Sequence, residues 1–148
     1  MSGTAKFASF LHRGVAKFGR EAPGGLVDLT KQFGSRWPTL QAVVAEGALQ
    51  ELTAASQGMT ADIAQERVQF LPPIGAPGKI LCVGVNYPDR NAEYKDGAEA
   101  PPFPSLFIRF PQSFVGHGAP LVRPRASRQF DYEGEIALVI GKGGRHIA

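Results

Sequence analysis

Hydrophobic and polar positions alternate in two short stretches near the start of the chain. Residues 6–11 and residues 15–18 place apolar side chains at roughly every second position, with Arg13 and Gly14 between them. A period of two is typical of β-strands, and a short break that contains glycine is typical of a tight turn. The pattern predicts a β-hairpin, followed by a third strand over residues 24–29.

The hydrophobic period changes after this segment. Three apolar residues follow Thr39 at the helical spacing i, i+3, i+4, and threonine is a favoured residue at helix N-termini. Gly47 interrupts the pattern, which resumes over residues 48–55 and stops before Gly58, where a C-terminal cap would fall. We therefore expect two short helices, the first beginning after Thr39.

A stretch rich in proline and glycine divides the chain. Residues 71–78 contain three prolines and two glycines, which is typical of a linker. The sequence thus predicts a small N-terminal α+β domain over residues 1–70, a linker over residues 71–78 and a second domain over residues 79–148.

The sequence of the second domain has the residue pattern typical of β-proteins. Strands are expected over residues 79–85, 105–110, 119–122 and 132–140, where β-branched and aliphatic residues are enriched. Residues 86–94 could form one or two helical turns between the first two strands. The predicted fold class is α+β, and mainly β.

Composition fits a folded domain. The chain has 148 residues, of which 43% are hydrophobic and 20% charged, and no apolar run reaches the ~18 residues that a membrane-spanning helix needs. The single cysteine, Cys82, lies in an apolar run and is expected to be a buried, unpaired thiol. The start of the sequence lacks the pattern of an export signal, so a cytoplasmic location is expected.

Charge argues against a nucleic-acid partner. The net charge is +3, but lysine and arginine are scattered along the chain and form no basic run. We expect neither a nucleic acid nor a membrane as a partner.

Two glutamates carry the most informative chemistry. Glu133 and Glu135 are two apart in a predicted strand, so they would share one face with Cα atoms about 6 to 7 Å apart. Without a neighbouring cation the two carboxylates would repel each other. Oxygen ligands suit a hard divalent ion such as Mg²⁺, Mn²⁺ or Ca²⁺. The alternative is a solvated strand face with no bound metal.

From residue 79 onward the chain resembles the fumarylacetoacetate hydrolase family. The resemblance rests on three segments in the family's order: KILCVGVNY (residues 79–87), PSLF (residues 104–107) and DYEGE (residues 131–135), the last followed by an aliphatic run. It implies a mixed β-roll catalytic domain with a small N-terminal α+β domain.

The resemblance also implies an activity and a cofactor. Glu133 and Glu135 would be ligands of Mg²⁺, or of Mn²⁺ or Ca²⁺, and the substrate would be a 2-oxo or 1,3-dicarbonyl acid. The reaction would be C–C bond hydrolysis, decarboxylation or keto–enol isomerisation, in the catabolism of aromatic compounds or amino acids. A third metal ligand, an aspartate, is expected about thirty residues later, so the catalytic domain looks truncated.

One departure from the family concerns proton transfer. The family often has Asn-Tyr-x-x-His-x-x-Glu, whereas here Arg90 stands at the histidine position and Glu93 keeps its place. A guanidinium cannot act as a base at neutral pH, so Arg90 would bind a carboxylate and Glu93 would carry the proton. This departure favours isomerisation or decarboxylation over hydrolysis. The alternative is an exposed helical ion pair between the two residues.

Two more residues are implied to contact the substrate. Arg109 and Ser113 lie in a segment that lines the pocket in the family, where a lysine commonly stands at the position of Arg109. Arg109 would then hold an anionic group of the substrate. The alternative is a solvated arginine.

A non-enzymatic hypothesis competes with these expectations. The strand predicted over residues 132–140 has apolar residues on both faces, which is typical of a strand covered on both sides. Such a chain, folded alone, would leave them exposed. We expect a homodimer or larger homo-oligomer, and the competing hypothesis is a truncated, non-catalytic family fragment that serves only as an assembly partner.

Overall fold

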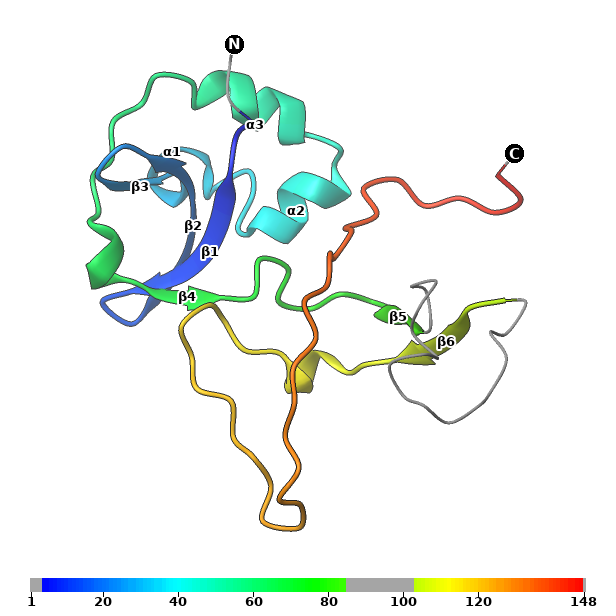
Figure 1. The fold of residues 1–148 in the computed structure, drawn as a ribbon. Helices are drawn as coiled ribbons and strands as arrows, with labels where there is room; N and C mark the ends of the chain where they lie inside the picture. The colour runs from blue at the N-terminus through cyan, green and yellow to red at the C-terminus, as the bar shows by residue number, and fades with distance from the viewer. Residues whose placement is uncertain (1–3, 85–102, 148) are drawn as a thin grey trace. The chain divides into compact units, whose positions relative to one another are not determined.

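The computed structural model describes residues 4–84 and 103–147 (Figure 1). The chain divides into two compact units. Unit 1 comprises Met1–Gly75 and Val115–Ala148, and unit 2 comprises Ala76–Phe114. Each unit is described by itself below.

A two-residue turn opens the sheet of unit 1. Strands β1 (Phe7–His12) and β2 (Val15–Ala22) pair antiparallel along their length. Arg13 and Gly14 between them both have positive φ angles, of 52° and 77°. Positive φ at both central residues matches the right-handed twist of the flanking strands. The predicted hairpin is therefore confirmed.

Two further strands complete this sheet, whose order is β3-β2-β1-β4. Strand β3 (Gly25–Asp28) pairs antiparallel with β2, as expected from the sequence, and is buried along its whole length. Strand β4 (Gln69–Leu71) pairs antiparallel with β1, and the sequence pattern did not predict it.

Three short helices lie between β3 and β4 in the chain: α1 (Thr30–Phe33), α2 (Leu40–Ala45) and α3 (Leu49–Ala55). The Oγ1 atom of Thr39 accepts a hydrogen bond of 3.1 Å from the backbone N–H of Ala42, which confirms the predicted N-cap. The predicted pair of helices is present, whereas α1 was not predicted.

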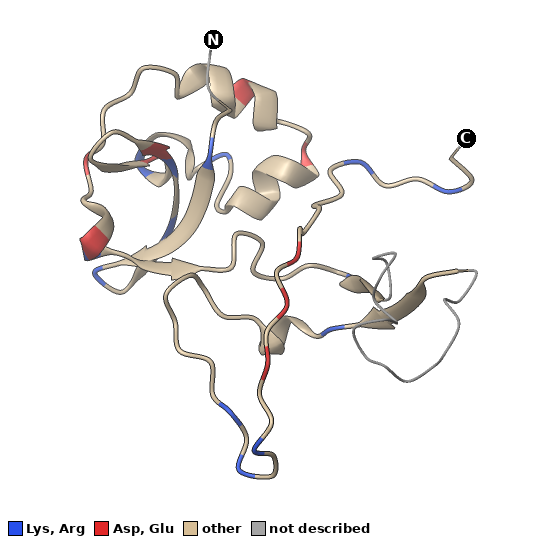
Figure 2. Ribbon diagram, viewed as in Figure 1, with Lys and Arg blue, Asp and Glu red and all other residues tan. Residues whose placement is uncertain are grey.

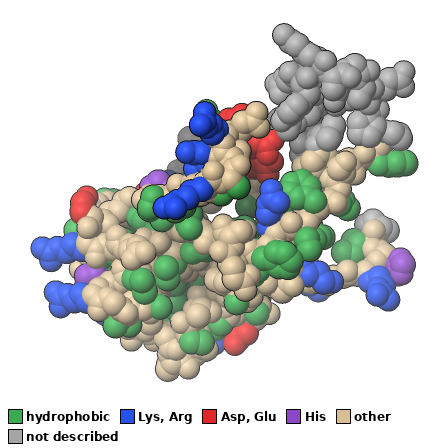
Figure 3. All heavy atoms as spheres, turned by 90° about the horizontal axis from the view of Figure 1, so that it is seen from below, with side chains coloured by type: hydrophobic (Ala, Val, Ile, Leu, Met, Phe, Trp, Pro, Cys, Tyr) green, Lys and Arg blue, Asp and Glu red, His purple; other side chains and the backbone are tan. Residues whose placement is uncertain are grey.

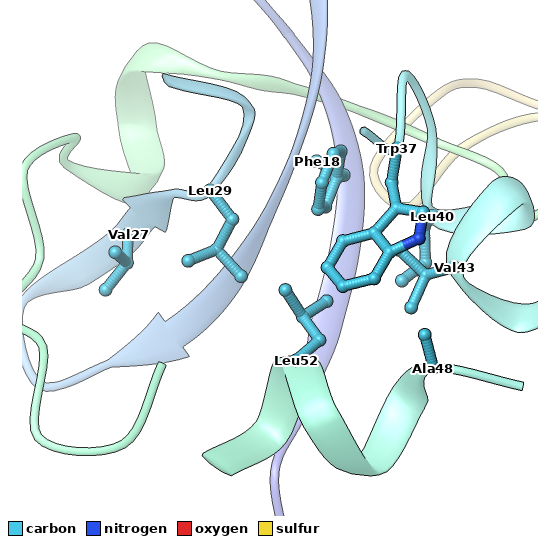
Figure 4. Packing of buried hydrophobic residues seen from close by; sticks show 8 residues of the cluster. All are labelled: Phe18, Val27, Leu29, Trp37, Leu40, Val43, Ala48 and Leu52. Carbon is cyan, nitrogen blue, oxygen red and sulfur yellow. The ribbon is translucent and has the colours of Figure 1, made fainter. Parts of the chain in front are cut away.

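The core of unit 1 lies between the sheet and the helices (Figure 4). Trp37 is fully buried at its centre and packs against Phe33. The buried cluster consists of Phe18, Val27, Leu29, Trp37, Leu40, Val43, Ala48 and Leu52. A second, smaller buried cluster joins Phe10, Leu26 and Ile63. Both strand alternation and helical spacing thus direct apolar side chains to a common interior.

Unit 2 contains a two-stranded antiparallel sheet. Strands β5 (Leu81–Gly84) and β6 (Ser105–Ile108) pair over four residues, which confirms the cores of two predicted strands. The 3-10 helix η2 (Pro111–Ser113) follows. Cys82 on β5 is half-buried and not fully buried as expected.

Two other predicted strands are not formed. Residues 119–122 and 132–140 have no regular secondary structure, and Tyr132 is 87% exposed. A strand requires a neighbour whose backbone completes the hydrogen-bond ladder, and the described residues offer these two segments none. Apolar and polar residues do alternate in the sequence, but this pattern does not provide the second strand with which the segment would pair.

Candidate functional site

The two candidate metal ligands lie in an extended, exposed segment of unit 1. Glu133 and Glu135 belong to residues 131–140, and Figure 2 shows the acidic positions in red along this part of the ribbon. Asp131 precedes them and its Oδ1 atom accepts a 2.8 Å hydrogen bond from the N–H of Tyr132. That bond turns the Asp131 side chain back onto its own backbone.

The donor set of this segment fits a hard cation in its chemistry. Both candidate ligands are carboxylates, and carboxylate oxygens are the ligands that Mg²⁺, Mn²⁺ and Ca²⁺ prefer. Within residues 4–84 and 103–147, no three side chains of the types His, Cys, Asp and Glu gather closely enough to hold a metal ion. A complete coordination shell would therefore need further oxygen ligands in addition to Glu133 and Glu135.

The candidate substrate-binding residues lie in unit 2. The Arg109 guanidinium lies over the ring of Phe107, 4.8 Å from the ring centroid, which is within the range of a cation–π contact. Arg109 is an exposed residue. Its guanidinium has the planar set of N–H donors that can bind a carboxylate.

Ser113 ends the 3-10 helix η2. Its Oγ atom donates a 2.8 Å hydrogen bond to the carbonyl of Phe110, the residue before the helix. The hydroxyl oxygen keeps lone pairs that can accept a hydrogen bond. Arg109 and Ser113 share unit 2, whereas the two glutamates belong to unit 1.

The proposed proton carrier and its neighbour are not described. Arg90 and Glu93, like the helical turns expected over residues 86–94, lie outside the described residues. Their roles stay predictions from the sequence.

An ion-pair network in unit 1 was not predicted. The Nζ atom of Lys17 lies 2.7 Å from Oδ2 of Asp28, whose side chain is fully buried. The other Asp28 oxygen accepts a hydrogen bond from the N–H of Thr30. The ion pair joins β2 to the end of β3, and the hydrogen bond from Thr30 ties the same carboxylate to the start of α1.

A second ion pair extends the network. Asp62 accepts a hydrogen bond from the N–H of Asp28 and pairs with Lys31. Burial on its own raises the pKa of the Asp62 carboxyl, but the hydrogen bond from Lys31 and the N–H of Asp28 outweigh it and hold the pKa below its usual value. The bond to Asp62 correspondingly raises the pKa of Lys31. No sequence signal marks these contacts, because the partners are 31 residues or more apart.

Comparison with known proteins assigns the second half of the chain to a family region. Residues 79–148 match the model of the fumarylacetoacetate (FAA) hydrolase C-terminal family. They form a partial fumarylacetoacetate hydrolase family region. The residues that carried the resemblance in the sequence, DYEGE among them, fall inside this match.

Some curated relatives match a longer part of this chain than residues 79–148. The mitochondrial oxaloacetate tautomerase Fahd2a of Rattus norvegicus is 35% identical over 127 residues, which are 84% of this chain and 40% of that protein. The oxaloacetate tautomerase YisK of Bacillus subtilis (strain 168) is 40% identical over 84 residues, 55% of this chain and 28% of that protein. The chain thus spans less than half the length of the curated relatives it matches.

A solved structure agrees with the family assignment. Fumarylacetoacetate hydrolase from psychrophilic Exiguobacterium antarcticum is 30% identical and superposes with a TM-score of 0.51, covering 76% of this chain and 38% of that one. The α+β, mainly β fold class predicted from the sequence is confirmed.

No helix among the described residues has the length and hydrophobicity to cross a membrane.

Proposed function

We propose that this chain is part of a divalent-metal-dependent enzyme of the fumarylacetoacetate hydrolase family that isomerises the keto and enol forms of a 2-oxo acid. The observation that carries the proposal is the pair Glu133 and Glu135, two exposed carboxylates inside the family region. The names of the relatives support it, because two of them are oxaloacetate tautomerases and oxaloacetate is a 2-oxo acid.

Glu133 and Glu135 would hold Mg²⁺, Mn²⁺ or Ca²⁺, together with ligands from outside this pair. When bound, the cation would polarise the oxygens of the substrate and stabilise the negative charge that develops on them during enolisation.

The chain's other candidate residues would bind the substrate and move its proton. Arg109 would hold a substrate carboxylate through its planar fork, and the hydroxyl of Ser113 would accept or donate a hydrogen bond beside it. Glu93 would take a proton from the carbon next to the carbonyl and return it to the carbonyl oxygen. The transfer is balanced within the substrate and consumes no water.

Arg90 supports isomerisation over hydrolysis. An arginine side chain stays protonated at neutral pH and cannot activate water as a base, whereas it can bind a second carboxylate. Hydrolysis would need an activated water molecule, and isomerisation does not. Decarboxylation also needs no activated water molecule, so it is the second reaction to assay.

The test is enolisation of oxaloacetate by the full-length protein with Mg²⁺ or Mn²⁺. Glu135→Ala is expected to lower kcat/KM at least 100-fold and to abolish metal binding in calorimetry, while Glu66→Ala on the 3-10 helix η1 (Gln65–Arg67) changes neither. An active Glu135→Ala enzyme would refute the metal-ligand role. An inactive wild-type protein that still forms a stoichiometric complex would favour the non-catalytic assembly partner.

The cellular location and the oligomeric state are separate matters. The vertebrate relatives are named as mitochondrial proteins, so the cytoplasmic location expected from the sequence stays a prediction. The homodimer or larger homo-oligomer also stays a prediction.

A further inference from the structure

A cleft in unit 1 lies at the turn between β1 and β2. It has a volume of about 400 Å³, and five of the residues that line it are charged: Arg13, Lys17, Asp28, Lys31 and Asp62. All five belong to unit 1, and none is a candidate residue of the proposed function. The volume is in the range of pockets that bind small metabolites.

Both carboxylates of the cleft already have partners within the protein. One oxygen of Asp28 accepts a 2.7 Å hydrogen bond from Nζ of Lys17, and the other accepts from the N–H of Thr30. One oxygen of Asp62 accepts from the N–H of Asp28, and the other accepts from Nζ of Lys31 over 2.5 Å. A cation that entered the cleft would therefore have to compete with these donors for every carboxylate oxygen.

The cationic side chains, by contrast, have donors without a partner among the described residues. An ammonium group has three N–H donors and a guanidinium has five. Lys17 and Lys31 each use one donor on a carboxylate, and Arg13 makes no hydrogen bond or ion pair with any described residue. Since three cationic side chains line the cleft with two carboxylates, one positive charge is uncompensated. Positive charge and free N–H donors are the groups that recognise an anion.

The uncompensated cation occupies a backbone position that does not favour arginine. Arg13 has a φ of 52° and is the first of the two residues between β1 and β2. A left-handed backbone is unfavourable for most L-residues, and asparagine or glycine is preferred at this position of a hairpin. The conformation of the turn therefore does not explain the arginine, whereas contact with a ligand would explain it.

We propose that this cleft binds a small dianion whose charge is carried by carboxylate or phosphate oxygens. The Arg13 guanidinium is its main contact, because its planar set of donors can bind two such oxygens at once. Lys17 and Lys31 contribute further N–H donors. The proposal does not depend on the proposed function, because the cleft contains no residue of the candidate metal or substrate site.

The test titrates the 148-residue chain with two probes, inorganic phosphate and malonate, at constant pH and ionic strength. Binding is followed by the amide resonances in NMR spectra, and the shifts are expected to centre on residues 12–17 and on Lys31. Binding of one probe without the other supports the site and assigns its ligand to the phosphates or to the dicarboxylates. Absence of binding by both probes would overturn the proposal.

Two variants test the role of the turn residue. Arg13→Asn removes the guanidinium and introduces a residue that favours a positive φ. We expect it to raise the Kd of the bound probe at least about fivefold, because charge-assisted hydrogen bonds are lost, and to raise the midpoint of urea denaturation, because the turn becomes less strained. The matched control is Arg145→Asn, since Arg145 is exposed and makes no hydrogen bond or ion pair with any described residue.

The control is expected to keep both the Kd and the denaturation midpoint of the wild type. A Kd that Arg13→Asn leaves unchanged would overturn the site. An equal rise of the Kd in both variants would overturn it as well, because it would show a general effect of net charge. A lower denaturation midpoint in Arg13→Asn would overturn the argument from the turn.

Discussion

Asp28 is a buried charged residue at the end of β3. Its carboxylate is fully buried and its partner Lys17 keeps only 18% of its side-chain exposure. Removing one partner of a buried ion pair leaves the other charge without compensation, which costs about 3 to 5 kcal/mol. Asp28→Ala is therefore expected to lower the free energy of unfolding by about 3 kcal/mol in urea denaturation at pH 7.

The matched control for Asp28 is a surface pair in the same sheet. Lys6 and Glu21 lie 3.1 Å apart, but both are more than half exposed. Exposed pairs contribute about 0 to 1 kcal/mol, so Glu21→Ala is expected to change stability by less than 1 kcal/mol. Equal losses in the two variants would contradict the distinction between the buried and the exposed pair.

Asp62 predicts how stability depends on pH. Its pKa is lowered in the folded chain, so it binds its proton less readily there than in the unfolded chain, where an aspartate titrates near about 3.9. Its contribution is fully present above pH ~4 and is lost as the pH falls through the folded-state value. The stability difference between wild type and Asp62→Asn is expected to be largest at pH 7 and to shrink toward pH 3, as followed by urea denaturation. A difference independent of pH would contradict the ionic role.

The candidate site was predicted from residue types together with the family resemblance. The spacing i, i+2 of Glu133 and Glu135 suits a hard cation as well as a solvated strand face, and the resemblance favoured the cation. Arg90 was set aside as a base because a guanidinium stays protonated at neutral pH. Lys17 and Asp28 could not be selected, because a lysine in a strand and an aspartate at a strand end are common and nothing local pairs them. The close approach of Gly116 to the backbone of Phe70 could not be predicted either, because the two residues are 46 positions apart.

The N-cap of α2 is the clearest test at the level of elements. The Oγ1 atom of Thr39 accepts the N–H of Ala42, one of the donors that a helix leaves unpaired at its first turn. Thr39→Ala is expected to cost about 1 kcal/mol in the free energy of unfolding, because that donor loses its partner.

Thr53 provides the control for the helix cap. Its hydroxyl donates to the carbonyl of Leu49 within α3, a carbonyl that the helix backbone already engages. Bonds of this kind add little to helix stability, so Thr53→Ala is expected to change it by less than about 0.5 kcal/mol. A loss as large as that of Thr39→Ala would show that the cap has no special role.

Short sequence patterns correctly predicted those elements whose formation depends on residues close together in the chain. The turn at Gly14 and the helix start at Thr39 depend on conformational preferences and on hydrogen bonds within a few residues, and both were read correctly. Strand β4 has only three residues and exists because β1 lies beside it, which no local pattern encodes. Residues 132–140 show the opposite case, since a strong strand pattern remains without a partner among the described residues.

At the scale of the whole molecule, exposed aliphatic side chains predict self-association. Hydrophobic side chains are visible on the surface shown in Figure 3, and among residues 4–84 and 103–147 Ile136 is the most exposed large one at 91%. Each large side chain that becomes buried in an interface gains about 1.5 to 3 kcal/mol. Light scattering of the 148-residue chain is expected to show a mass above 15.8 kDa that rises with concentration.

Substitutions in that segment test the source of the association. Replacing Ile136, Leu138 and Ile140 together by serine is expected to lower the measured mass toward that of the monomer, whereas the apolar changes Ile136→Val, Leu138→Ile and Ile140→Val retain association. A monomer in the unsubstituted chain at all concentrations would refute the prediction.

The protein contains one tryptophan, and the structure makes it a selective optical reporter. Trp37 is fully shielded from water in the larger core cluster, its indole N–H donates to Glu46 over 2.9 Å and the Arg36 guanidinium lies 4.1 Å from its ring centroid. Its emission therefore senses the melting of the core formed by β2, β3 and the helices. Unfolding by urea can be followed in parallel by indole fluorescence and by far-ultraviolet circular dichroism. Coincident unfolding curves are expected if the core of unit 1 unfolds together with the remainder of the chain in one cooperative transition.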